Sequence, residues 1–231
     1  MISFDKDVQI GIVGAGTMGA GIAQVASAAG HNVVIYDVNS LATEKALNYI
    51  RSGLDKLVEK GKISQLTADG ISSRVTISNN LNDFSNCGLI IEAIIEDIKI
   101  KKEMFTKLED VVSNDCILAT NTSSLSVGSI GSACKNPERV AGLHFFNPAN
   151  ILPLVEIIPS VLTEKSIIES LYILISTWGK VPVIAKDTPG FIVNKVARPF
   201  YGEALIIYEE GLADFTSIDF AMKSIGGFKM G

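Results

Sequence analysis

The amino-acid sequence predicts an α/β fold: a doubly wound, mostly parallel sheet with an inserted helical arm, followed by the start of an all-α C-terminal domain. Three observations predict it. Short apolar runs alternate with segments of helical periodicity, as in a parallel sheet covered by helices. The glycine-rich turn Gly14–Gly19 follows the first apolar run and opens the first helix. After the turn Asp187–Gly190, only helical segments follow.

The chain begins as strand, turn, helix and strand. The apolar runs Val8–Val13 and Val33–Tyr36 predict buried strands, and Met18–Ala29 predicts a helix of small side chains between them. Gly30 is expected to end this helix. A lone GxGxxG pattern indicates only a tight turn, but here a strand precedes it, a helix follows it and an acidic residue ends the next strand. This context is typical of a Rossmann-like dinucleotide-binding unit.

Each glycine of this turn has a physical reason. Gly14 permits the turn, Gly16 lets the backbone approach a pyrophosphate, and Gly19 lets the helix pack against the strand. The helix N-terminus supplies positive potential to the phosphates. Asp37 would accept hydrogen bonds from a ribose and repel a 2′-phosphate, which favours NAD over NADP. The expected cofactor-binding residues here are Gly14, Gly16, Thr17, Met18, Gly19 and Asp37.

A helical arm at about residues 40–73 is predicted between the second strand and the short strand Val75–Ile77. Apolar residues at three- and four-residue spacings mark one face of its first helix, which Asn39 or Ser40 can cap. The arm carries Lys56, Lys60 and Lys62. These lysines form either a solvated helix face or a surface for an anionic part of a substrate, and the sequence leaves both interpretations open.

Strands and helices then alternate to the end of the sheet. Further strands are expected at Leu89–Ile95, Ile117–Thr120, Val140–Phe145, Val155–Ile158 and Val181–Ala185. Further helices are expected at Lys99–Val112, Ser124–Cys134 and Glu164–Trp178. Residues 1–186 are therefore expected to form the cofactor domain. Residues 187–231 are expected to be a partial, truncated helical domain with helices at Gly190–Glu209 and Asp214–Ile225.

Composition excludes several classes of protein. The 20 basic and 25 acidic residues give a net charge of −5 without long charge runs, which argues against nucleic acid or an anionic membrane as a partner. The uncharged stretch Val8–Tyr36 is long enough to cross a bilayer, but its glycines and its change of period favour the interpretation above. Cys87, Cys116 and Cys134 form no CxxC pair, so we expect reduced thiols, no metal site and a cytoplasmic location.

Only two histidines can supply an imidazole for acid and base chemistry. His31 begins the second strand, at the edge away from expected ligands, and is predicted to be structural. His144 ends an apolar strand, where a general base would lie, although a lone strand histidine is more often a core residue. Glu156 is a single carboxylate inside another apolar strand, and burying it unpaired would be costly. Pairing it with His144 removes that cost and orients the imidazole.

Two more polar residues are expected near His144. Ser123 follows the strand Ile117–Thr120 and is predicted to point into the cleft while Ser124 caps the next helix. Asn194 lies one turn into the helix after Pro189 and is predicted to face the domain junction.

Five segments together resemble the 3-hydroxyacyl-CoA dehydrogenase family, in particular its bacterial 3-hydroxybutyryl-CoA dehydrogenase branch. They span the chain in the family's order: Gly14–Ala23, Glu92–Glu96, Asn121–Ser124, His144–Pro148 and Asp187–Asn194. The resemblance implies NAD-dependent oxidation of (S)-3-hydroxyacyl-CoA, with 3-hydroxybutyryl-CoA as the expected substrate, to 3-oxoacyl-CoA and the reverse reaction. It also implies a role in fatty acid metabolism and a homodimer, with family chains that continue past the segment in which this one ends.

The resemblance also implies roles for individual residues. Its catalytic residues would be the base His144, the orienting partner Glu156, and Ser123 and Asn194 on the substrate oxygen. The nicotinamide side of the cofactor site would be lined by Glu96, Lys101, Ser123 and Asn147. Asp37 would bind the adenosine ribose, and the arm would hold part of coenzyme A.

Two other functions stay open. The same fold can serve a dehydrogenase for 3-hydroxyadipyl-CoA or for a free hydroxy acid. A non-catalytic, crystallin-like NAD-binding protein is the other alternative. Four polar residues that converge on one cleft weigh against it, because a structural protein has no need of them.

Overall fold

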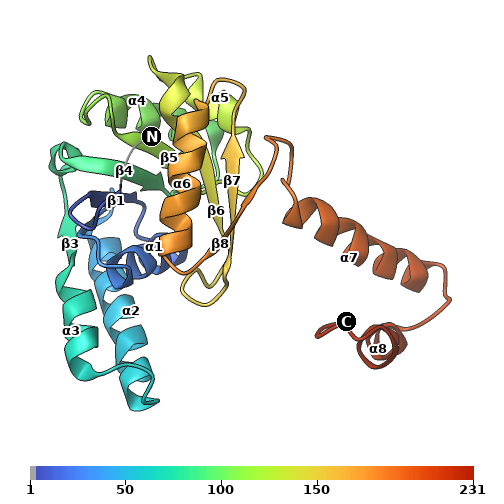
Figure 1. The fold of residues 1–231 in the computed structure, drawn as a ribbon. Helices are drawn as coiled ribbons and strands as arrows, with labels where there is room; N and C mark the ends of the chain where they lie inside the picture. Colours follow the sequence, from blue (N-terminus) through green and yellow to red (C-terminus); the bar gives the residue numbers. More distant parts are fainter. Residues whose placement is uncertain (1–3) are drawn as a thin grey trace. The chain divides into compact units, whose positions relative to one another are not determined.

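The structure, a computed structural model, describes residues 4–231. The chain divides into two compact units, Met1–Pro189 and Gly190–Gly231 (Figure 1). The strands of the first unit are β1 (Gln9–Val13), β2 (Val33–Tyr36), β3 (Val75–Ser78), β4 (Cys87–Glu92), β5 (Ile117–Thr120), β6 (Val140–Phe145), β7 (Leu154–Pro159) and β8 (Val181–Ile184). They form one sheet in the order β3-β2-β1-β4-β5-β6-β7-β8, and only the β6–β7 pair is antiparallel. The predicted mostly parallel, doubly wound fold is confirmed.

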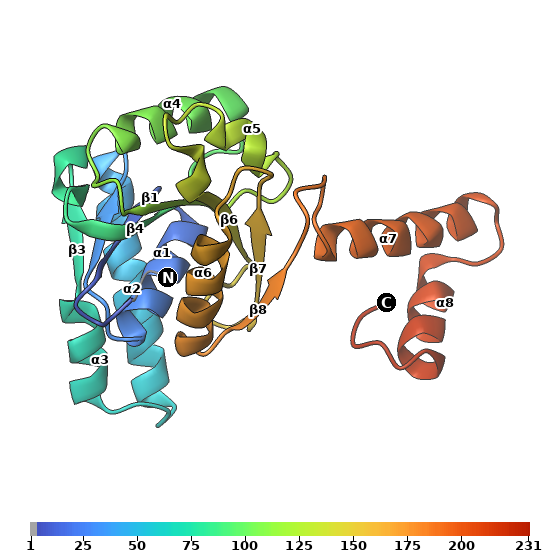
Figure 2. The same ribbon diagram turned by 45° about the horizontal axis from the view of Figure 1, so that its top comes forward.

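Helices cover both faces of this sheet (Figure 2). They are α1 (Thr17–Ala28), α2 (Ser40–Glu59), α3 (Gln65–Ser73), α4 (Ile98–Glu109), α5 (Val127–Gly131) and α6 (Lys165–Thr177). The main core lies on the face of the sheet that α1 and α6 cover, and it includes alternate strand residues such as Ile10 and Ile12 together with Ile22 and Leu171. Removing this apolar surface from water is the dominant stabilisation of the unit.

The predicted arm consists of α2 and α3, which contact each other. The side chain of Asn39 accepts a hydrogen bond from the backbone N–H of Leu41, and that of Ser64 caps α3 through Thr67. Ala46, Ile50 and Leu54 form the buried face of α2, as their spacing predicts.

Several predicted element bounds are wrong, and three of them differ because of local hydrogen bonding or backbone geometry. The strand expected at Leu89–Ile95 ends at Glu92, whose carboxylate accepts the N–H of Ile94. The helix expected from Ser124 begins at Val127 with Ser126 as its cap, because Thr122 Oγ1 accepts the N–H groups of Ser124 and Leu125 and holds them in a turn. The helix expected from Gly190 begins at Val193, because Gly190 and Phe191 have left-handed φ values of 79° and 47°.

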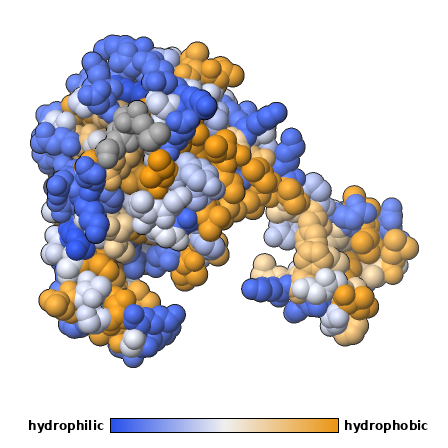
Figure 3. All heavy atoms as spheres, viewed as in Figure 1, coloured by the Kyte–Doolittle hydropathy of each residue, from blue (hydrophilic) through white to orange (hydrophobic). Residues whose placement is uncertain are grey.

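The second unit contains α7 (Val193–Glu209) and α8 (Phe215–Phe220), which continues as a π-helical turn at Ala221–Ile225. None of the side chains of α7 is buried, and Val196 and Leu205 are among its exposed apolar residues. Hydrophobic side chains are visible on the surface of this unit in Figure 3. Among the described residues, no helix combines the length and apolar character needed to span a bilayer.

His31 lies in the first unit, at the end of the sheet where β2 begins, and belongs to the structural core. Its side chain is 3% exposed, Nδ1 lies 3.1 Å from the carbonyl oxygen of Val8, and the ring contacts Trp178. Burial lowers the pKa of His31, the Val8 contact opposes this shift, and the charge of Lys6 adds to it.

This lowered pKa predicts a pH-dependent stability. The unfolded chain binds the proton at the ordinary pKa of 6.5, before the folded chain does, so the stabilisation is complete above that pH and is lost as the pH falls through the folded pKa. The slope contributed by one such group is at most about 1.4 kcal/mol per pH unit. In urea titrations between pH 7.5 and 5, His31→Gln is expected to flatten this dependence. Identical slopes in both proteins would contradict the assignment.

Candidate active site

The predicted site residues of the first unit gather at the carboxyl ends of the parallel strands. From β1 the sheet continues through β2 and β3 on one side and through β4, β5 and β6 on the other. Ligands of open α/β sheets bind in the crevice at such a switch of direction. Val13 and Glu92 are register partners at the ends of β1 and β4, so they mark this point.

The glycine-rich turn has the shape that a dinucleotide requires. Gly14 has a φ of 102°, and a Cβ there would lie 2.5 Å from the carbonyl oxygen of Ala93. A Cβ on Gly19 would overlap the carbonyl oxygen of Gly14. A Cβ on Gly16 meets no atom within 4 Å, and Gly16 caps α1 without a side-chain bond. The open space therefore lies at the N-terminus of α1, where backbone N–H groups can bind a phosphate.

Asp37 has a structural role that the sequence did not predict. Its Oδ2 accepts a hydrogen bond of 2.8 Å from the N–H of Ala15, inside the glycine-rich turn, and its Oδ1 accepts one of 2.9 Å from Asn39. Asp37 thus ties the end of β2 to the turn. Each carboxylate oxygen can accept more than one hydrogen bond, so binding of the adenosine ribose stays a prediction.

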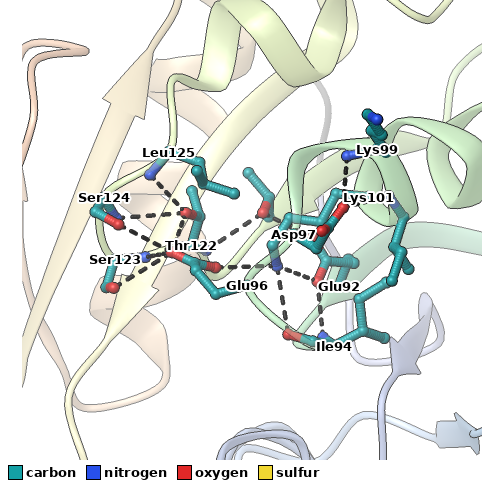
Figure 4. Close-up of polar contacts among 12 residues, drawn as sticks. Glu92, Ile94, Glu96, Asp97, Lys99, Lys101, Thr122, Ser123, Ser124 and Leu125 are labelled. Atoms are coloured by element: carbon teal, nitrogen blue, oxygen red, sulfur yellow. Dashed lines mark hydrogen bonds and ion pairs between the residues drawn. The ribbon is translucent and has the colours of Figure 1, made fainter.

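Two carboxylates flank one ammonium group at the end of β4 (Figure 4). Lys101 is 1% exposed, and its Nζ lies 2.6 Å from Glu92 Oε1 and 3.3 Å from Glu96 Oε2. Glu92 is completely buried and also accepts hydrogen bonds from the N–H of Ile94 and from Thr120 Oγ1, at 2.7 Å each. We call Glu92, Lys101 and Glu96 the acidic triad.

Glu96 connects the acidic triad to the residues after β5. Its Oε1 accepts hydrogen bonds from Thr122 Oγ1 at 2.6 Å and from the Ser123 N–H at 2.9 Å, and Ser123 Oγ lies 3.3 Å away (Figure 4). Burial alone would raise the pKa of Glu96, but the bonds from Thr122 and Ser123 and the Lys101 ammonium hold it below its ordinary value. Glu96 is therefore a charged anchor for the backbone of Ser123.

Sequence reasoning assigned Lys101 to the cofactor and missed Glu92. In the structure the Lys101 ammonium is bound by the two carboxylates and lies 3.4 Å from the carbonyl oxygen of Ile94, so a contact between Lys101 and the cofactor stays a prediction. Glu92 carries the same signal as Glu156, a single carboxylate inside an apolar run. That signal predicts a buried partner for it as well.

The predicted contact between His144 and Glu156 is present. The two residues are register partners on the antiparallel pair β6 and β7, and Nδ1 of His144 lies 2.7 Å from Oε2 of Glu156. Glu156 is completely buried and His144 is 5% exposed. The ring of His144 also packs against Phe146 at a centroid distance of 4.5 Å. The imidazole is thus fixed by one carboxylate and one aromatic ring.

The loop that carries Asn147 is held from two sides. Lys180 Nζ donates hydrogen bonds to the carbonyl oxygens of Ala149 at 2.6 Å and Leu152 at 2.9 Å, and burial lowers the pKa of Lys180. Asn150 Nδ2 donates to Gln24 Oε1 on α1. These contacts fix the loop next to His144, whereas the role of Asn147 toward the cofactor stays a prediction.

The remaining predicted site residues are placed as follows. Asn194 is the second residue of α7, in the second unit, and its binding of the substrate oxygen stays a prediction.

All three cysteines are buried, which raises the pKa of each thiol to about 12. Within residues 4–231, no cluster of three or more metal-ligating side chains occurs.

Comparison with known proteins decides the family. Residues 9–188 match the family described as "3-hydroxyacyl-CoA dehydrogenase, NAD binding domain", and residues 190–231 match its C-terminal domain. The chain belongs to the 3-hydroxyacyl-CoA dehydrogenase family. Its first unit is therefore this family's NAD-binding domain.

Individual relatives agree with this family. 3-Hydroxybutyryl-CoA dehydrogenase of Clostridioides difficile is 41% identical over 97% of this chain and 80% of its own length. 3-Hydroxyadipyl-CoA dehydrogenase of Escherichia coli is 42% identical over 96% of this chain, but the match spans only 47% of that relative, about half its length. The crystal structure of (S)-3-hydroxybutyryl-CoA dehydrogenase PaaH1 from Ralstonia eutropha has a TM-score of 0.95 and 34% identity over 96% of this chain and 79% of that chain.

Two glycine variants separate the fold of the turn from its binding of NAD. Gly19→Ala is expected to lower the free energy of unfolding by about 2–3 kcal/mol, because the methyl group overlaps backbone. Gly16→Ala is expected to cost less than about 1 kcal/mol, yet to weaken NAD binding about tenfold by filling the open space at α1. Urea titration and calorimetric titration with NAD measure the two effects. A folded Gly16→Ala protein with unchanged NAD affinity would argue against this binding place.

Proposed function

We propose that the chain catalyses the NAD-dependent oxidation of (S)-3-hydroxybutyryl-CoA to the 3-oxoacyl-CoA, and the reverse reaction, in the cytoplasm. The observation that carries this proposal is the buried hydrogen bond between His144 and Glu156 at the end of β6, within a chain of this family. A histidine held by a carboxylate at a ligand-binding sheet edge is the arrangement that a general base requires.

The proton transfer follows from this geometry. Because His144 Nδ1 is committed to Glu156, Nε2 is the nitrogen that takes the proton of the substrate's secondary alcohol. When bound, NAD supplies the acceptor for the hydride that leaves the same carbon. The imidazolium that forms beside Glu156 is stabilised by the carboxylate, and in the reverse direction it returns the proton to the ketone oxygen.

The substrate oxygen is assigned to Ser123 and Asn194. Support for Ser123 comes from Glu96, which fixes the Ser123 backbone at the end of β5. Asn194 is assigned through the family segment Asp187–Asn194 alone. Ser123 would hold the oxygen next to the base, so that proton and hydride leave from one defined position.

The acyl-CoA part of the substrate is assigned to the arm. Lys56, Lys60 and Lys62 are exposed there and supply positive charge for an anionic group. A second candidate substrate is 3-hydroxyadipyl-CoA, after which the Escherichia coli relative with 42% identity is named. For the whole protein we propose a homodimer, supported by the exposed apolar side chains of α7.

Oxidation of NADH by the purified chain tests the activity and its substrate. Acetoacetyl-CoA is expected to be reduced, and free acetoacetate to react at least about 100-fold more slowly if the arm binds coenzyme A. The 3-oxo derivative of adipyl-CoA, run in parallel, tests the second candidate. Equal rates with the free acid would exclude a role of the arm in substrate binding.

The two histidines provide a matched pair of variants for the base. His144→Gln is expected to retain NADH binding and to lose about 10²–10⁴-fold in kcat, the usual contribution of a general base. His31→Gln serves as the control and is expected to keep its activity at pH 8. Near-normal turnover of His144→Gln would remove His144 from the mechanism.

A further inference from the structure

The acidic triad carries an unbalanced charge inside the protein. Glu92 accepts hydrogen bonds from the Lys101 ammonium, the Ile94 N–H and Thr120 Oγ1, and its ion pair with Lys101 measures 2.6 Å. The Lys101 ammonium is bound by Glu92, Glu96 and the Ile94 carbonyl oxygen.

Glu96 is the second negative charge of the triad. It accepts hydrogen bonds from Thr122 and Ser123 in addition to its ion pair with Lys101, and its pKa is lowered. Two negative charges therefore surround one positive charge, and the triad as a whole is an anion.

The place of this anion is the switch point of the sheet. Glu92 ends β4 next to the end of β1, and the N–H of Ala93 donates to the carbonyl oxygen of Val13, immediately before the glycine-rich turn. Ala93 also lies directly against Gly14. A buried charge at this place acts through protein of low dielectric constant and is screened little by salt. The nearby charges of Asp97 and Lys99 are exposed and opposite in sign.

We propose that the acidic triad makes the site selective for the oxidised form of the cofactor, with Glu92 as the residue that sets the selectivity. The nicotinamide ring is positively charged in NAD and neutral in NADH. A fixed anion at the crevice therefore stabilises bound NAD and not bound NADH. This inference rests on the proposed function, because it needs the nicotinamide to lie at the triad's end of the sheet.

A variant that lacks the Glu92 charge tests the proposal through measurements of cofactor binding alone. Glu92→Gln keeps the shape of the side chain and leaves the triad neutral. The preference for NAD is the ratio of the NADH dissociation constant to the NAD dissociation constant. Glu92→Gln is expected to lower this ratio roughly fivefold, which is the effect of one charge acting over several ångströms at an effective dielectric constant above 20. Calorimetric titrations of the purified chain with NAD and with NADH at physiological ionic strength give this ratio.

Glu109→Gln is the matched control. Glu109 is also a buried carboxylate in an ion pair, with Arg139 at 3.3 Å, but it lies at the far end of α4. Its replacement is expected to lower stability and to leave the ratio unchanged.

Glu96→Gln provides a second route if Glu92→Gln does not fold. Glu96 is 37% exposed, so its replacement removes the same charge with less effect on the core. This variant is expected to lower the ratio in the same direction.

The outcomes separate this inference from the proposed function. A drop in the ratio for the triad variants alone supports it. Equal weakening of NAD and NADH in Glu92→Gln would show a merely structural role and overturn it. An unchanged ratio in Glu96→Gln would overturn it as well. Failure of the unaltered chain to bind either form would overturn the proposed function, and this inference with it.

Discussion

The hydrogen bond between His144 Nδ1 and Glu156 Oε2 is the contact on which the rest of the site depends. A completely buried carboxylate is stable only with a partner, and the antiparallel pairing of β6 with β7 places that partner directly opposite it. Because Nδ1 of His144 contacts Glu156, Nε2 is the ring nitrogen that would exchange a proton with a substrate. Stability of the sheet and orientation of the base thus come from one interaction.

The same requirement for a partner governs the other buried carboxylates. Glu92 is paired with Lys101 at the switch point of the sheet, and Glu109 is paired with Arg139 at the opposite end of α4. Glu109 also accepts hydrogen bonds from the N–H groups of Lys135 and Asn136, so it holds a turn together far from the crevice. A buried ion pair therefore does not identify a site by itself. Its position at the carboxyl ends of the parallel strands does.

Periodicity and glycine placement predicted the strand and helix order, because buried strands and amphipathic helices leave different apolar spacings. The lone carboxylate in an apolar run predicted the partner of Glu156, and Glu92 carries the same signal. One hydrogen bond from side chain to backbone was not predicted: Thr122 Oγ1 accepts the N–H of Leu125, so α5 begins later than expected. Phe191 has a left-handed backbone conformation, so α7 begins later along the chain than predicted. The antiparallel turn into β7 does have a sequence signal, because the link 146–153 is shorter than the dozen or so residues of a parallel crossover.

The tautomer of His144 tests the central claim most directly. With only two histidines in the chain, a ¹⁵N-detected spectrum of the labelled protein can be assigned by comparison with His31→Gln. If Glu156 accepts a hydrogen bond from Nδ1, neutral His144 carries its proton on Nδ1, and Nε2 shows the chemical shift of an unprotonated, basic nitrogen. A neutral His144 protonated on Nε2 would contradict the account, because Glu156 would then face an unprotonated nitrogen and Nε2 could not accept the substrate's proton.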